Sequence, residues 1–120
     1  MPATLYERLG GEDRITRLVA DAVDNHYHNP LIQARFEKIS DRAVAERHLV
    51  EFMCAGSGGT QTYSGRDLVS AHKGMNVSEQ EFVAAIDDML AAMTKNGYDQ
   101  AEKNDVVAIL YSLKGDVVRL

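Results

Sequence analysis

The chain lacks three features that would each point to a particular class of protein. Its single cysteine, Cys54, rules out an intramolecular disulfide framework, and we expect it to be a small buried side chain. The 13 Lys and Arg residues are scattered through a chain of net charge −5, whereas nucleic acid binding needs a concentrated positive face. No apolar run reaches membrane-spanning length, and no N-terminal stretch has the pattern of a signal peptide. We therefore expect a cytoplasmic protein that binds no nucleic acid and inserts into no membrane.

Motifs of protein-only metal sites are absent as well. The sequence contains no CxxC, no HExxH and no Glu-x-x-His pair of the kind that binds two irons in helical bundles. His26 and His28 alternate, so on a helix their side chains diverge. We expect both to be solvated residues at a helix end, where their charge suits the helix dipole. A site built from three or four converging protein ligands is therefore not predicted.

Signals for helices, in contrast, recur along the whole chain. Thr4 with Glu7, and Ser78 with Glu81, have the spacing of capping boxes, and Ser40 or Asp41 is placed to cap another helix. Apolar residues then follow at helical spacing, and glycines mark several ends. Strand alternation, internal repeats and linkers are not evident. We expect one all-α domain over residues 1–120, with a 45% hydrophobic composition sufficient for a packed core.

The predicted helices can be placed approximately. A short first helix ends at Gly10-Gly11, and a long second one ends at Tyr27, before Pro30. A short helix is expected over 31–36, a long one from 41 to 56, a single turn at His72, and long helices over 78–97 and 99–117. The inner face of the helix over 41–56 is predicted to carry Ala45, His48, Leu49, Phe52 and Met53. That of the helix over 99–117 is predicted to carry Val106, Leu110, Leu113 and Val117.

His72 is the residue that most suggests a function. A lone histidine near an apolar face is often a hydrogen-bonded structural residue. It becomes a sufficient metal ligand only when a cofactor brings the remaining ligands, as haem does with four porphyrin nitrogens. Such a cofactor needs a flat apolar slot, which Phe36, Phe52, Val77, Phe82 and Ile86 can line. Both readings of His72 remain open on this pattern alone.

A set of short motifs, in order, makes the cofactor reading specific. These are Leu5-Tyr6-Glu7-Arg8-Leu9-Gly10-Gly11, Tyr27, Phe36, Phe52, Gly58-Gly59, Tyr63-x-Gly65 and Ala71-His72-Lys73-Gly74. With them the chain resembles, along nearly its whole length, a group I truncated haemoglobin, the bacterial two-over-two globin. The resemblance implies an α-helical sandwich around haem b, with His72 as the proximal ligand of the iron.

The resemblance also assigns roles to other residues. Tyr27 would donate a hydrogen bond to a gas ligand on the distal side; its matched position favours this role over that of a core tyrosine with its hydroxyl at the surface. Phe36 would pack on the haem face. The full expected pocket comprises Tyr27, Phe36, Ala45, His48, Leu49, Phe52, Tyr63, Arg66, Met75, Val77, Phe82 and Ile86 around His72.

The chain departs from relatives on the distal side. Many relatives carry glutamine at one or both of the positions of Ala45 and Leu49, and here both are apolar. His48 matches a position where some relatives place a sixth iron ligand, and it can instead face a haem propionate or water. Arg66 is either a propionate partner or a solvated surface charge. No histidine follows His72, so the covalent haem link made by a C-terminal histidine in some relatives is not available.

Two classes of function follow from the resemblance. The first is reversible binding of dioxygen, nitric oxide or carbon monoxide, with an enzymatic version in which dioxygen and nitric oxide give nitrate and an external reductase restores ferrous iron. Weak peroxidase activity is a further variant. The second class is a gas sensor, carrier or bis-histidyl electron-transfer protein, favoured if His48 closes the sixth position. We expect a monomer, because no surplus apolar face demands a partner. A helical interaction domain without cofactor is the remaining alternative.

Overall fold

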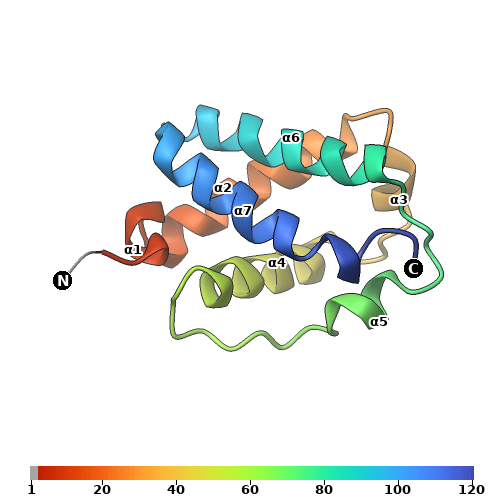
Figure 1. The fold of residues 1–120 in the computed structure, drawn as a ribbon, viewed down its shortest axis with the longest axis horizontal. Helices are drawn as coiled ribbons and strands as arrows, with labels where there is room; N and C mark the ends of the chain where they lie inside the picture. The colour runs from red at the N-terminus through yellow and green to blue at the C-terminus, as the bar shows by residue number, and fades with distance from the viewer. Residues whose placement is uncertain (1–2) are drawn as a thin grey trace.

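The computed structural model describes residues 3–120, which form an all-helical fold (Figure 1). The first two residues of the predicted domain lie outside this range. The helices are α1 (Leu5–Leu9), α2 (Gly11–Tyr27), α3 (Gln33–Glu37), α4 (Arg42–Gly56), α5 (Leu68–His72), α6 (Glu79–Lys95), α7 (Gln100–Ser112) and the 3-10 helix η1 (Lys114–Asp116). The predicted all-α class is confirmed. Within the described range, no helix combines the length and apolar character needed to cross a membrane.

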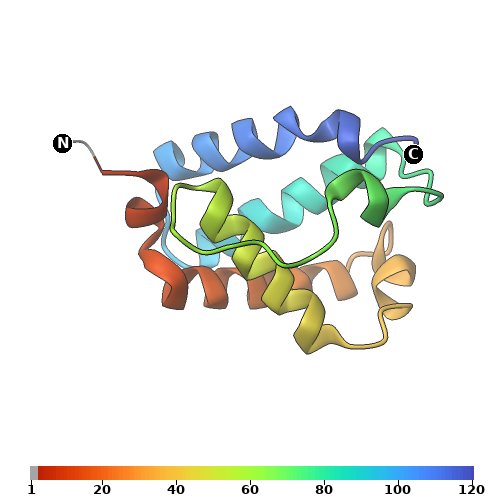
Figure 2. The same ribbon diagram turned by 90° about the horizontal axis from the view of Figure 1, so that it is seen from below.

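The long helix α2 is the centre of the fold. It packs against α6 on one side and α4 on another, while α7 lies along α6 and reaches α1 (Figures 1 and 2). The main core gathers buried side chains from α1, α2, α4, α6, α7 and the turn between α6 and α7, namely Leu9, Ile15, Leu18, Val19, Ala22, Val23, Cys54, Ala92, Met93, Tyr98 and Val106. Cys54 is buried there, as expected from the sequence. This core leaves α5 and the segment 57–67 at the edge of the molecule.

Local sequence explains where most helices begin. The side chain of Thr4 accepts from the backbone N–H of Glu7, and that of Ser78 accepts from the backbone N–H of Glu81. Each glutamate carboxylate in turn accepts from the backbone N–H of the capping residue. Asp41 caps α4 by accepting from the N–H of Val44 at 3.2 Å. Between α1 and α2, Gly10 has φ +95°, a conformation that L side chains rarely adopt. Both predicted capping boxes and the Asp41 cap are thus confirmed.

The end of the last helix differs from the prediction. α7 stops at Ser112, and Leu113 and Val117 lie beyond it rather than on its inner face. The chain turns through η1 and then runs beside the segment that follows His72. There the N–H of Asn76 donates to Leu120 O at 2.8 Å, and the N–H of Arg119 donates to Val77 O at 2.9 Å. These distant backbone bonds replace the helical ones that apolar spacing alone suggested.

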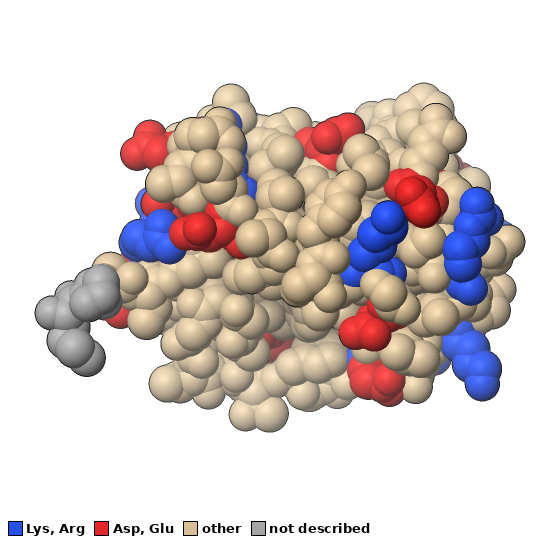
Figure 3. Space-filling view, viewed as in Figure 1, with Lys and Arg blue, Asp and Glu red and all other residues tan. Residues whose placement is uncertain are grey.

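The charged residues of the described surface are mixed in sign. Figure 3 shows acidic and basic side chains interspersed over one face of the molecule. Several form pairs between elements, such as Lys114 of η1 with Glu79 of α6 at 3.4 Å and Lys95 of α6 with Asp21 of α2 at 3.1 Å. Exposed pairs of this kind contribute little stability, typically ~0–1 kcal/mol.

Candidate functional site

His72 is the last residue of α5, and its ring is oriented by its own helix. Nδ1 lies 2.8 Å from the carbonyl oxygen of Leu68, one turn earlier. A carbonyl oxygen only accepts, so Nδ1 must carry the proton and donate it. The other ring nitrogen, Nε2, is then left with its lone pair, which is the form that binds a metal. Asp67 caps the helix by accepting from the N–H of Ser70, which fixes this turn locally.

The helix α4 presents an apolar face that the protein itself leaves open. Cys54 is its only buried residue among those described, although the helix has 15 residues and many are apolar. Leu49 is 38% exposed, and Ala45 and Phe52, one turn before and after it, are half-buried. Near His72, Val69 of α5 is 43% exposed. The inner face predicted for α4 therefore exists, but within the chain it has only partial cover.

Aromatic rings connect this face to the segment 57–67. The Tyr63 ring meets Phe52 edge-on with centroids 5.6 Å apart, and His48 in the same manner at 6.3 Å. The Tyr63 hydroxyl donates to the carbonyl of Arg66. The structure thus brings three of the predicted pocket residues together at one end of α4. Arg66 itself has an exposed side chain.

The Tyr27 hydroxyl is engaged with the backbone. It donates to the carbonyl oxygen of Phe36 at 3.0 Å, and the Tyr27 ring contacts the Phe36 ring edge-on at 5.9 Å. The guanidinium of Arg42 lies over the Tyr27 ring, 4.9 Å from its centroid. A hydroxyl has one proton to donate, and here it points to Phe36. A distal role for Tyr27 requires exchange of this bond and stays a prediction.

The remaining predicted lining residues lie after His72. Val77, Phe82 and Ile86 are all buried, and Met75 is half-buried. The Phe82 ring contacts Tyr111 of α7 edge-on at 5.7 Å, a partner that the sequence analysis did not include. This group belongs to the start of α6 and is separate along the chain from the α4 group. The two groups and His72 are the candidate walls of one slot.

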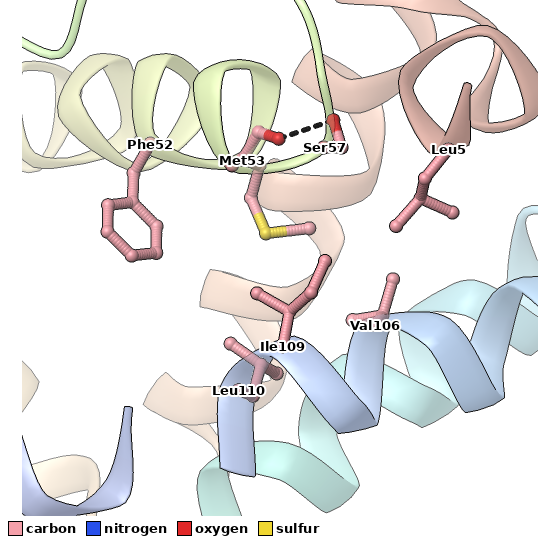
Figure 4. Close-up of a pocket in the computed structure, with 8 residues that line it drawn as sticks. Leu5, Phe52, Met53, Ser57, Val106, Ile109 and Leu110 are labelled. Carbon is pink, nitrogen blue, oxygen red and sulfur yellow. Dashed lines mark hydrogen bonds between the residues drawn. The ribbon is translucent and has the colours of Figure 1, made fainter. Parts of the chain in front are cut away.

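A small apolar pocket lies where α4, α7 and α1 meet. It is lined by Leu5, Phe52, Met53, Gly56, Ser57, Val106, Ile109 and Leu110 (Figure 4). Figure 4 shows Met53 and Phe52 pointing from α4 toward the side of α7 that carries Ile109 and Leu110. The open volume is about 10 Å³, room for about one water molecule and far too small for a macrocycle. Phe52 lines this pocket and also belongs to the open face of α4.

The expectation for His26 was wrong. Its side chain is buried, at 8% exposure, and Nδ1 lies 2.8 Å from Oδ2 of Asp88 in α6. Its ring also stacks on Phe36, with centroids 4.6 Å apart and planes 23° apart. Burial lowers the pKa of His26, and this outweighs the opposing effect of Asp88. His28 is exposed as expected.

Comparison with known proteins identifies this arrangement. The pattern of the bacterial-like globin family matches residues 4–119. The chain is a bacterial-like globin. It is 29% identical to a group 1 truncated hemoglobin of Tetrahymena pyriformis over 120 residues, covering 98% of this chain and 96% of that one. It is 32% identical to one of Synechocystis over 114 residues, covering 89% of each.

Solved structures agree on the fold of this globin. The truncated hemoglobin of Tetrahymena pyriformis in its Fe(III) form superposes with a TM-score of 0.94 at 24% identity, covering 98% of this chain and all of that one. The 2/2 hemoglobin of Synechococcus sp. PCC 7002, described with covalently attached heme, gives 0.86 at 25% identity and covers 97% and 98%. The predicted two-over-two architecture and the resemblance to group I truncated haemoglobins are both confirmed.

Haem, the group implied by the family, fits the residues of this globin. His72 offers an unprotonated nitrogen, which is what a ferrous or ferric iron takes from a protein. The half-exposed side chains of Ala45, Leu49 and Phe52 provide an apolar wall whose burial would be favourable. His48 and Tyr63 add polar atoms at the end of this wall. The donor set and the open face therefore match a flat, largely apolar iron macrocycle.

Proposed function

We propose that this globin holds haem b through Nε2 of His72 and binds a diatomic gas on the opposite side. The observation that carries the proposal is the 2.8 Å bond between His72 Nδ1 and Leu68 O, which leaves Nε2 free for iron. Haem supplies the iron, its redox change and the coordination position for the gas. The chain's residues orient the imidazole, form the pocket and determine what can enter it.

On the distal side, the chain contributes mainly apolar surface. Ala45, Leu49 and Phe52 exclude water from the gas, and so favour small uncharged ligands such as dioxygen, nitric oxide and carbon monoxide. Tyr27 is the proposed hydrogen-bond donor to the gas. Its hydroxyl exchanges the bond to the Phe36 carbonyl for this one. Arg66 or His48 would face the propionates at the open end.

Nitric oxide dioxygenation is the proposed reaction. Nitric oxide, dioxygen and one electron give nitrate, so each turnover consumes one electron from the reduced protein. That electron has to be restored by an external reductase, which is the implied partner. A monomeric state and a cytoplasmic location are part of this proposal.

The test of this activity is a single-turnover measurement. The ferrous protein with bound dioxygen is mixed with an equal amount of nitric oxide in the absence of free dioxygen. The nitrate formed is quantified, and the visible absorption spectrum is recorded. We expect about one nitrate per haem and conversion to the ferric spectrum. Recovery of nitric oxide unchanged, without nitrate, would contradict the reaction while leaving gas binding intact.

His48 decides between an open and a closed distal site. The His48 ring contacts the ring of Tyr63. We therefore propose that His48 does not ligate the iron and that the sixth coordination position stays open to the gas. We expect His48→Ala to leave the ferric and ferrous absorption spectra unchanged. His28→Ala is the matched control, because His28 is exposed and its ring bonds only to Asp24 O of its own helix. Conversion of a low-spin to a high-spin spectrum by His48→Ala would instead support the bis-histidyl, electron-transfer alternative.

A further inference from the structure

A cluster of polar side chains at the end of α2 converges on one residue of α6. The side chain of Asn25 donates to the backbone carbonyl of Asp88 at 3.0 Å. The Asp88 carboxylate accepts from Asn29 at 3.1 and 3.2 Å, and from His26 at 2.8 Å. The side chains of His26 and Asp88 are only 11% and 14% exposed. Three side chains of residues 25–29 therefore bind Asp88, two of them at its nearly buried carboxylate.

This bond fixes the orientation of the His26 ring. A carboxylate only accepts, so Nδ1 of His26 is the donor to Asp88. The bond to Asp88 places a proton on Nδ1, and burial lowers the pKa of His26, which favours the neutral ring. The Nδ1–H of His26 lies in the plane of the ring and donates to Asp88, which Asn25 and Asn29 also hold. This bond limits rotation of the imidazole. The face of the ring is thereby set, and Phe36 stacks on that face.

Phe36 has little else to hold it. It lies in α3, a helix of five residues in which no residue is buried and no side chain caps the start. The Phe36 carbonyl accepts from the Tyr27 hydroxyl, and the Phe36 ring stacks on His26 and meets the Tyr27 ring edge-on. Two adjacent residues of α2 therefore hold Phe36, and His26 supplies the stacked contact on the face of its ring.

The helix α6 supplies a second anchor for α3. Arg35 donates to the carboxylate of Glu81, and this guanidinium holds the pKa of Glu81 down at about 2. Glu81 and Asp88 are seven residues apart, which places them on the same face of α6. Glu81 thus holds α3 directly through Arg35, and Asp88 holds it through His26.

We propose that His26 is a positioning residue: anchored by Asp88, its imidazole holds the Phe36 ring where that ring contacts haem. The inference rests on the proposed function for the contact between Phe36 and haem. Protoporphyrin IX has no two-fold symmetry in its plane, so a fixed ring against it favours one of two insertion orientations. His26 therefore acts on haem retention and seating without touching the iron.

The first arm of the test uses the protein without haem. In the proton NMR spectrum we expect nuclear Overhauser contacts between the ring protons of His26 and Phe36. Asp88→Asn keeps an acceptor oxygen and should preserve these contacts, whereas Asp88→Ala should lose them. Loss in neither variant would contradict the anchoring by Asp88.

The second arm measures the haem-loaded protein. His26→Ala and Asp88→Ala should each release haem to an excess of an acceptor apoglobin about threefold to tenfold faster, the size expected when one pair of stacked rings is lost. Both should also populate a second haem orientation in the hyperfine-shifted methyl signals. The double variant should be no worse than either single one, because both act through the same contact. His28→Ala is the control and should change nothing.

The outcomes separate this inference from the proposed function. If the unchanged protein takes up no haemin, the proposed function fails and the positioning role fails with it. If the unchanged protein binds haem, but folded His26→Ala releases it at the same rate and in the same orientation, only the positioning role is wrong. Fully additive effects of the two alanine variants would show that His26 does not act through Asp88.

Discussion

His72→Gly is expected to weaken haem binding by more than about a hundredfold, because losing even an outer partner of a ligand costs about tenfold to a hundredfold. Nε2 of His72 is the proposed protein ligand, and the bond to Leu68 fixes its ring in the binding tautomer. Glycine is tolerated at this place, since His72 ends its helix and is only half-buried. The measurement is a haemin titration of both proteins, followed by absorbance.

Added imidazole provides the matching rescue. It should enter the space left by the side chain and restore a one-to-one complex of His72→Gly with haem. It should leave the folding of the protein unchanged. His28→Gly, at an exposed residue of the same type, controls for a general loss of histidine. A His72→Gly protein that binds haemin as tightly as the unchanged chain, without imidazole, would show that another residue ligates the iron.

Leu49→Gln is expected to slow the release of dioxygen by about tenfold to a hundredfold. Leu49 lies on the open face of α4 at 38% exposure. The amide adds a donor to a wall that is otherwise apolar, and a hydrogen bond to a charged or strongly polarised acceptor contributes about 1.5–3 kcal/mol. Carbon monoxide develops little charge, so its release should hardly change. Flash photolysis and stopped-flow measurements of both gases provide the comparison.

Leu49→Met is the control for a change of shape without a donor. It should leave both release rates near those of the unchanged protein. Equal slowing of dioxygen and carbon monoxide by Leu49→Gln would indicate a narrower exit path instead of a hydrogen bond. No change at all would show that Leu49 does not face the gas.

Local patterns in the sequence predicted the parts of the fold that depend on near neighbours. Thr4 with Glu7, and Ser78 with Glu81, are three residues apart, so their caps can be recognised without knowing the fold. The acceptor for His72 could have been found in the same way, because Leu68 precedes it by four residues on one helix. The order of short motifs around His72 then indicated the family.

Contacts between distant segments were the parts that the sequence did not predict. His26 was expected in solvent because its partner, Asp88, is 62 residues away. The last helix was expected to continue to Val117, but backbone bonds between 76–77 and 119–120 take the chain elsewhere. In both cases a long-range partner overrides a local preference. The alternation of His26 with His28 correctly indicated that the two side chains diverge, but not that His26 would be the buried one.

The most direct test of the account is a titration of the purified protein with haemin, recorded in the ferric state and again after reduction by dithionite. We predict saturation at one haem per chain, a ferrous spectrum of a five-coordinate, histidine-ligated iron, and a large spectral shift on adding carbon monoxide. Absence of saturable binding would contradict the account at its centre. A six-coordinate ferrous spectrum that resists carbon monoxide would keep haem binding but contradict the open distal site.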